Sequence, residues 1–174
     1  MWNGLGVVRQ ATGGHHRRRL VGVFAVRAAN GAVMSNDPQC IFCKIATGDV
    51  PAHRVLETET AVAFLDVGPV ARGHVLLIPR SHWTTVDRMP ADVLADVTSC
   101  IPRLAAALMK FDGVDGINVL QNNGRCAGQV VEHVHFHLIP RRAGDGLGYR
   151  WNAGTYGEGE AETVRDELAG ILGG

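Results

Sequence analysis

The segment Glu132-His133-Val134-His135-Phe136-His137-Leu138-Ile139-Pro140 decides the fold of this chain. Histidines alternate with apolar residues along it, and strict alternation predicts a β-strand. Successive side chains of a strand point to opposite faces, so we expect His133, His135 and His137 to share one face. Three imidazoles beside a buried surface are costly to desolvate without partners. The segment therefore predicts a functional site.

The composition is that of an ordinary globular domain. The chain has 174 residues, of which 46% are hydrophobic and 20% charged, enough for one domain with a core. Seventeen basic residues balance seventeen acidic ones, so we expect no bulk attraction to nucleic acid or to an anionic membrane. No apolar run reaches membrane-spanning length. Four cysteines with a single close pair do not make a disulfide scaffold, which predicts a cytoplasmic protein.

Residues 1–33 differ in kind from the rest. They are Gly-rich and basic and contain one short apolar run, Leu20–Val26. A secretory signal is one interpretation, but the run has only seven residues before Arg27 interrupts it. We therefore interpret residues 1–33 as a disordered leader or a mis-assigned start, with Met34 as the natural start. A single domain over residues 34–157 and a weakly helical tail over residues 158–174 complete the predicted organisation.

The segments before the histidine run predict an α+β fold. Short runs at residues 53–56, 61–65, 73–79 and 116–120 are typical of strands. Between the third and fourth lies an amphipathic helical stripe, which Pro102 should kink or split. The stripe comprises Val93, Val97, Ile101, Leu104, Leu108 and Phe111. Strands in sequence with one inserted helix predict an antiparallel meander of about five strands packed on one long helix.

The turn before the histidines has the composition of an anion-binding loop. Asn122-Asn123-Gly124-Arg125-Cys126-Ala127-Gly128-Gln129 combines Gly and Asn, which accept left-handed conformations and expose backbone N–H groups. With the three histidines, it closely resembles the signature of the histidine triad (HIT) superfamily. Phe64-Leu65-Asp66-Val67-Gly68-Pro69 and Arg72-Gly73-His74 are similar to that family's nucleotide-contacting segment, and Ile41-Phe42-Cys43-Lys44-Ile45 to the amino-terminal motif of its Hint-like branch. The resemblance spans about residues 40–151.

The resemblance implies a HIT fold whose sheet is extended by dimerisation, hence a homodimer. It also implies cleavage at the α-phosphate of a nucleotide through a nucleotidyl-histidine intermediate. His135 matches the family's nucleophile, and imidazole suits the task because it is neutral and nucleophilic near pH 7. His137, Gln129 and the turn amides match the groups that stabilise charge on the phosphate oxygens.

The same resemblance assigns the nucleotide contacts. Asp66 matches the ribose-binding carboxylate, whose oxygens can accept from two hydroxyls. Asn122 matches a residue of the phosphate region, and His74 is a further candidate there. Apolar side chains near Ile41, Phe42 and Phe64 are expected around the base. One departure concerns Val130, because several relatives carry a hydroxyl residue at this position; the leaving group is therefore left open.

Cys40 and Cys43 form a C-x-x-C pair. Two unligated thiols, a redox pair and a metal site are the alternatives, and the strand and helix context of a thioredoxin-like redox pair is not visible. The resemblance favours zinc, because HIT proteins with such a pair can bind it through the first triad histidine and another upstream, here His133 and His82. Four protein ligands would make the zinc structural and leave no open position.

The leading hypothesis is a HIT-family hydrolase or transferase that acts on purine nucleoside phosphoramidates or similar mononucleotide conjugates. One alternative keeps the chemistry but takes diadenosine polyphosphates, as in the Fhit-like branch. Another is a nucleotide-binding protein with negligible turnover. The chemistry itself requires no cofactor.

Overall fold

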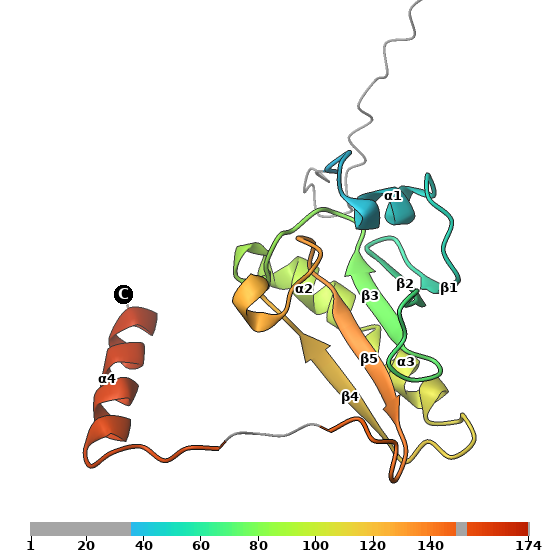
Figure 1. Cartoon of the computed structure of the whole chain (residues 1–174). Helices are drawn as coiled ribbons and strands as arrows, with labels where there is room; N and C mark the ends of the chain where they lie inside the picture. Colours follow the sequence, from blue (N-terminus) through green and yellow to red (C-terminus); the bar gives the residue numbers. More distant parts are fainter. Residues whose placement is uncertain (1–35, 149–152, 174) are drawn as a thin grey trace, which may run out of the picture.

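The computed structural model describes residues 36–148 and 153–173, so the predicted leader and Met34 lie outside the described residues. Five strands and the helices around them follow in chain order (Figure 1). They are α1 (Ile41–Thr47), β1 (Arg54–Glu57), β2 (Ala61–Leu65), β3 (Val75–Pro79), the 3-10 helix η1 (Val86–Arg88), α2 (Ala91–Thr98), α3 (Ile101–Leu108), β4 (Gly116–Gln121), the 3-10 helix η2 (Arg125–Ala127), β5 (Phe136–Arg141) and α4 (Glu160–Leu172). The predicted α+β class and five-stranded antiparallel sheet are confirmed.

The strand order is β1-β2-β3-β5-β4, so the expected simple meander is wrong. Strand β5 lies between β3 and β4 and is antiparallel to both, which makes β3 and β4 parallel to each other. Parallel strands need a long crossover, and the helical segment between β3 and β4 supplies it. The order follows burial: β5 is mostly buried, whereas every residue of β4 is at least partly exposed.

The predicted long helix is split in two, as the position of Pro102 suggested. Helix α2 ends at Thr98 and α3 begins at Ile101, with Pro102 in the first turn of α3, where its missing N–H costs nothing. Four positions of the apolar stripe are buried against the sheet, Val93, Val97, Leu104 and Leu108, while Phe111 at its end is 40% exposed.

The sheet separates two apolar clusters. Val75 and Leu77 of β3 face α2 and α3, whereas Leu76 and Ile78 face the opposite side, where α1 packs. In β5, Leu138 joins the α2–α3 side, so the alternating residue His137 lies on the α1 side. The alternation of side chains along β5 therefore places the imidazole of His137 on the α1 side of the sheet, which has the thinner cover.

The histidine segment is only partly strand. Strand β5 begins at Phe136, so His133 and His135 precede it, contrary to the prediction of one strand from residue 132. The backbone N–H of Val134 donates to the carbonyl of Trp83 at 2.6 Å, a bond to the loop after β3 rather than to a strand. The chain is therefore held in an extended form by a loop before the ladder begins.

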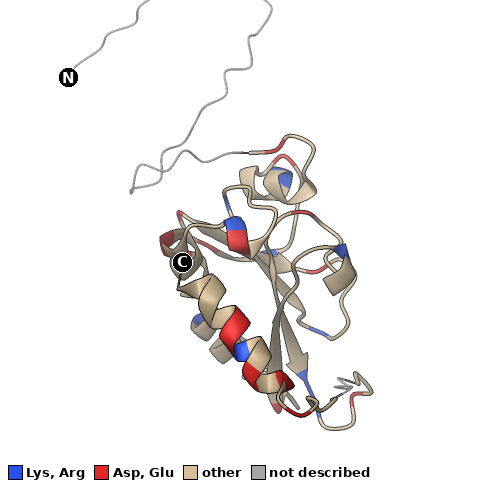
Figure 2. Ribbon diagram, turned by 90° about the vertical axis from the view of Figure 1, so that its left-hand side faces the viewer, with Lys and Arg blue, Asp and Glu red and all other residues tan. Residues whose placement is uncertain are grey.

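Charge is mixed across the molecule. Basic and acidic residues are scattered over the domain, and α4 carries several acidic residues (Figure 2). Within the described residues, no helix is both long and apolar enough to cross a membrane.

Gly73 offers a test of the turn that leads into β3. Its φ of +88° is unfavourable for other residues, and an added Cβ would lie 2.9 Å from Cε2 of Phe111. We expect Gly73→Ala to lower the free energy of unfolding by about 1–3 kcal/mol in urea titrations. Gly116→Ala is the matched control, because its Cβ would have open space and should change stability little. Equal effects of the two substitutions would contradict this account.

Candidate active site

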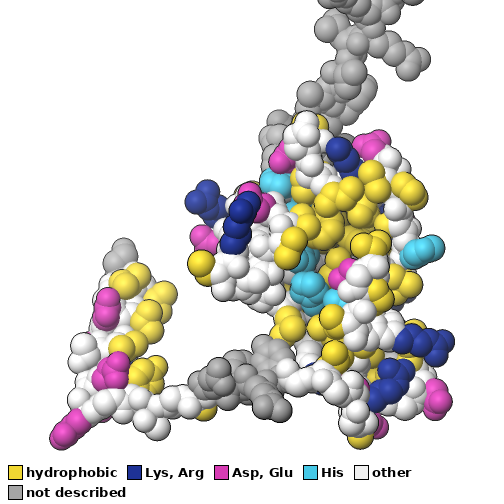
Figure 3. All heavy atoms as spheres, viewed as in Figure 1, with side chains coloured by type: hydrophobic (Ala, Val, Ile, Leu, Met, Phe, Trp, Pro, Cys, Tyr) yellow, Lys and Arg dark blue, Asp and Glu magenta, His cyan; other side chains and the backbone are white. Residues whose placement is uncertain are grey.

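A pocket of about 520 Å³ opens on the α1 side of the sheet. Its walls are mainly apolar, and two histidines and one carboxylate stand at one side; Figure 3 shows histidines beside the hydrophobic surface. The lining residues are Ile41, Phe42, Ile45, Val50, Pro51, Ala52, Phe64, Asp66, Val67, Leu76, Gly128, Val130, Val131, His135 and His137. An apolar cavity with a few convergent polar groups is the usual form of a small-molecule site.

Helix α1 forms one wall and was not expected from the sequence. Two arginines donate to carbonyls of its last turn: Nη2 of Arg54 donates to the carbonyl of Ile45 at 2.5 Å, and Nη1 of Arg80 donates to that of Ala46 at 2.8 Å. The helix places the Phe42 ring against the ring of His135, with centroids 5.3 Å apart. The apolar spacing of residues 41, 42 and 45 was the available helical signal.

His135 lines the pocket in a defined tautomer. Its Nδ1 lies 2.6 Å from the backbone carbonyl of His133, which can only accept, so Nδ1 carries the proton. In the neutral ring, Nε2 then holds a lone pair. Among the described residues, His135 therefore presents the geometry of a nucleophilic imidazole at the pocket wall.

His137, His74 and Asp66 form a chain beside His135. Nδ1 of His137 lies 2.9 Å from Nε2 of His74, and Nδ1 of His74 lies 3.5 Å from Oδ2 of Asp66. The rings of His135 and His137 are 5.0 Å apart. His74 is 3% exposed and does not line the pocket, so it stands behind His137 rather than beside a ligand.

Burial keeps these imidazoles neutral. Desolvation, with smaller contributions from His135 and His74, lowers the pKa of His137 from 6.5 to about 4. Burial also lowers the pKa of His74, and the negative charge of Asp66 opposes that shift. Near pH 7 the rings of His137 and His74 are thus neutral, and either one can donate the hydrogen bond between them.

Gln129 and Asn122 are placed in the loop that closes the pocket. Oε1 of Gln129 accepts from the N–H of Gly124 at 2.7 Å, while Nε2 donates to the carbonyls of Thr84 and Val131. The side chain is buried and ties both ends of the loop together. Nδ2 of Asn122 lies near Gly128, which lines the pocket, but Asn122 itself does not.

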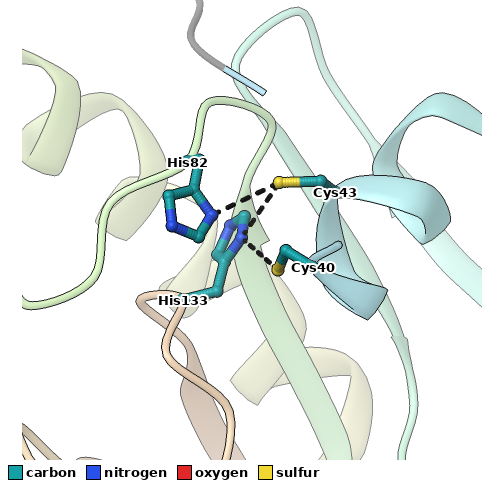
Figure 4. A group of neighbouring side chains, drawn as sticks. All are labelled: Cys40, Cys43, His82 and His133. Carbon is teal, nitrogen blue, oxygen red and sulfur yellow. Dashed lines mark hydrogen bonds between the residues drawn. The ribbon is translucent and has the colours of Figure 1, made fainter. Parts of the chain in front are cut away.

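The four predicted metal ligands come together at one end of α1 (Figure 4). Nδ1 of His133 lies 3.4 Å from Sγ of Cys40 and 3.6 Å from Sγ of Cys43, and Nδ1 of His82 lies 3.4 Å from Sγ of Cys43. A tetrahedral zinc ion with ordinary bond lengths would separate sulfur from nitrogen by about 3.6 Å. The donor set and its spacing therefore fit zinc.

His133 is prepared for such a role. Nε2 lies 3.1 Å from the carbonyl of Pro79, so it carries the proton and leaves Nδ1 available toward the thiols. Burial lowers the pKa of His133 to about 4 and raises that of Cys43 to about 12. A neutral imidazole is the ligand form, whereas the thiol has to lose its proton when a metal binds.

The sequence comparison gives the class of protein. The HIT domain family matches residues 47–144. An adenosine 5'-monophosphoramidase of Candida albicans is 43% identical over 125 residues, covering 69% of this chain and 82% of that protein. An adenylylsulfatase of Arabidopsis thaliana is 40% identical over 116 residues, covering 67% of this chain and 58% of that protein.

Solved structures agree. A Streptococcus mutans protein superposes with a TM-score of 0.76 at 32% identity, covering 87% of this chain and 97% of its own. A zinc-bound histidine triad family protein of Mycobacterium smegmatis gives a TM-score of 0.61 at 35% identity, covering 78% and 96%. This chain belongs to the HIT domain family, which confirms the resemblance predicted from the histidine segment.

The lowered pKa of His137 predicts a pH-dependent stability. Between pH 7 and pH 5, the unfolded chain protonates this imidazole near pH 6.5, whereas the folded chain does so only near pH 4. Stability is therefore lost as the pH falls through this range. We expect His137→Asn to lose about 1–2 kcal/mol less free energy of unfolding than the wild type between pH 7 and pH 5. This value is smaller than the full pKa shift implies, because the ring is partly solvated. Urea unfolding at both pH values measures it, and identical pH dependence in wild type and variant would contradict it.

Proposed function

We propose that this chain is a HIT-family hydrolase or transferase that cleaves at the α-phosphate of a purine nucleoside phosphoramidate or a similar mononucleotide conjugate. The observation that carries the proposal is His135, an imidazole at a pocket wall with Nδ1 fixed by a carbonyl and Nε2 available as nucleophile. The phosphoramidase and sulfatase names of its relatives support a nucleotide substrate.

The proposed reaction has two steps. Nε2 of His135 attacks the α-phosphorus, a phosphorus–nitrogen bond to the enzyme forms, and the bond to the leaving group breaks. The leaving amine takes a proton and departs. Water or another acceptor then attacks the same phosphorus, loses a proton, and releases the nucleotide with regeneration of His135.

His137 suits the proton transfers because its neighbour His74 can either donate or accept the hydrogen bond that joins the two rings. When Nε2 of His74 carries the proton, a neutral His137 presents Nε2–H and can donate to a phosphate oxygen or to the leaving group. When the proton lies on Nδ1 of His137, the ring presents a lone pair that can accept from water. We assign His74 as a positioning residue, since it reaches the pocket only through His137.

The remaining groups bind and orient the nucleotide. Asp66 lines the pocket with its carboxylate, which can accept from the ribose hydroxyls. Ile41, Phe42 and Phe64 provide apolar walls for a purine. Gln129 holds the loop through its bonds to Gly124, Thr84 and Val131. Asn122 lies close to Gly128 at the pocket, where its amide could donate to a phosphate oxygen.

Val130 makes the leaving group the least determined part of the proposal. Its side chain is 91% exposed at the pocket and supplies no hydroxyl. Diadenosine polyphosphates, the alternative substrate, carry a charged leaving group that would gain from a donor here. Rates on an adenosine phosphoramidate, adenylylsulfate and a diadenosine polyphosphate, measured side by side, separate the substrate classes.

Substitution of His135 tests the nucleophile. We expect His135→Asn to lower kcat on adenosine phosphoramidate by at least about 10³-fold, because the attacking nitrogen is removed. Intact-mass analysis should detect a nucleotidyl adduct in the wild type and none in the variant. His53→Asn, an exposed histidine outside the pocket lining, is the control and should retain activity. A wild type with neither adduct nor turnover would favour the alternative of a nucleotide-binding protein.

We further propose that Cys40, Cys43, His82 and His133 hold one structural zinc ion. The converging donors and the zinc-bound relative support this assignment. The ion would supply only a fixed link between α1 and the segment that carries His135, because all four positions around it are filled by protein. The unpaired state of the described cysteines also supports a reducing, cytoplasmic location.

Metal analysis tests the zinc proposal directly. Protein purified without chelator should contain one zinc per chain. The double variant Cys40→Ser/Cys43→Ser should lose essentially all of it and unfold at lower temperature, since metal binding contributes to folding. Cys126→Ser, which changes an exposed cysteine outside the cluster, should keep its zinc. A zinc-free wild type would refute the assignment.

We also propose that the chain forms a homodimer through β4. Among the described residues, this edge strand pairs only with β5. It contains Ile117, Val119 and Leu120, and Val119 is 43% exposed. An apolar strand with an unpaired edge is a template for pairing with another chain.

A further inference from the structure

The loop between β4 and β5 lies beside the chain that leads from β3 to α2 (Figure 1). Residues 123–128 of this loop are exposed, and Gln129 after them is buried. The loop closes on itself, because Oε1 of Gln129 accepts from the N–H of Gly124 at 2.7 Å. An exposed loop has few packing contacts, so its position depends on hydrogen bonds to its surroundings.

Residues 83–86, which we call the docking segment, provide such bonds. Nε2 of Gln129 donates to the carbonyl of Thr84 at 2.7 Å. The N–H of Val134 donates to the carbonyl of Trp83 at 2.6 Å. The docking segment is itself anchored, because the side chain of Trp83 packs against the core cluster beside α2 and α3. The end of the loop and the chain after it are thus fixed to a firm support.

Asn123 attaches the beginning of the loop to the same segment. Its Oδ1 accepts from the N–H of Val86 at 2.8 Å. Its Nδ2 donates to Oε1 of Gln121 at 2.7 Å, and Nε2 of Gln121 lies 3.2 Å from Oδ1. Because a backbone N–H can only donate, the oxygen of Asn123 has to face Val86. The neighbouring amide of Gln121 holds it in that orientation.

We propose that Asn123 is a positioning residue: it holds the beginning of this loop on the docking segment and so fixes the place of Asn122 and Gly128 at the pocket. This role rests on the proposed function, and the HIT resemblance assigned none to Asn123. Asn123 does not line the pocket and therefore acts through its neighbours. Asn122 precedes it directly, and Gly128 of the same loop lines the pocket.

Loss of the bond to Val86 should affect the transition state more than substrate binding. The apolar wall of α1 and the Asp66 carboxylate after β2, which are proposed to hold the base and the ribose, belong to other elements. Asn122, the proposed phosphate contact, is the group that would shift. A small displacement of a group that stabilises the transition state lowers kcat, whereas unchanged base and ribose contacts preserve KM.

Substitution of Asn123 tests this expectation. Asn123→Ala should lower kcat on adenosine phosphoramidate about fivefold, which corresponds to the net contribution of one hydrogen bond, and change KM by less than about twofold. Asn123→Asp keeps an oxygen acceptor for the N–H of Val86, so it should recover most of the lost kcat. Arg88→Ala, which changes an exposed residue of η1, is the control and should match the wild type. An unchanged kcat in Asn123→Ala would overturn the proposal.

Val86→Pro removes the same bond from its other side. Proline has no N–H, is tolerated at the first residue of a helix and needs an extended residue before it. Val86 begins η1, and Thr85 before it is extended, with φ −141° and ψ 157°. We expect Val86→Pro to lower kcat as Asn123→Ala does, and the double variant to be at most about twofold worse than either. Effects that multiply in the double variant would show that the two residues share no bond and would overturn the proposal.

Hydrogen exchange followed by mass spectrometry tests the attachment of the loop without catalysis. The amides of residues 124–129 should exchange at least about threefold faster in Asn123→Ala and Val86→Pro than in the wild type and Arg88→Ala. Equal exchange in all of these proteins would overturn the proposal. Faster exchange in the two variants of a protein that shows no turnover would contradict the proposed function and support the attachment of the loop by Asn123.

Discussion

The position of one imidazole, His133, constrains the rest of the site. Its Nδ1 faces the thiols of Cys40 and Cys43 on α1, its Nε2 bonds the carbonyl of Pro79 at the end of β3, and its own carbonyl holds the ring of His135. A shift of this residue would therefore move α1, the pocket wall and the ring of His135 together. The residue that looks like one of three equivalent histidines instead links His135 to α1 and to the end of β3.

Burial gives the histidines different tasks. Desolvation keeps His133 and His137 neutral at pH values where exposed imidazoles begin to charge. A neutral ring offers one donor and one acceptor, so each hydrogen bond made by one nitrogen decides what the other can do. In His135, Nδ1 donates to the carbonyl of His133, which leaves Nε2 as an acceptor toward the pocket. Burial thus keeps the rings neutral, and the hydrogen bonds determine which nitrogen of each ring carries the proton.

Those parts of the fold and site that depend on residues close in sequence could be predicted from the sequence. The apolar stripe around Pro102 gave both helices and the break between them, because side-chain periodicity and proline chemistry act within a few residues. The histidine alternation found the site but overestimated the strand, since the carbonyl of Trp83 holds Val134 outside the ladder. That bond joins segments far apart in sequence.

The roles of the supporting residues depended on longer-range contacts. His74 appeared beside the phosphate by motif position, but the structure places it behind His137, where only the fold brings them together. Gln129 likewise uses its amide within its own loop. The strand order could not be derived either, because local patterns do not state which edge a late strand will join. Motif position identified the residues, and packing determined what each one touches.

The insertion of β5 between β3 and β4 has a consequence for synthesis of the chain. A ribosome delivers β3, both crossover helices and β4 before the strand that has to join them. Until residues 136–141 emerge, the strand that joins β3 to β4 is missing, so the edges of β3 and β4 stay unpaired and the sheet is completed only near the end of the domain. Nascent chains that stall in this interval would expose both edges to neighbouring polypeptides, and a chaperone would be most useful there.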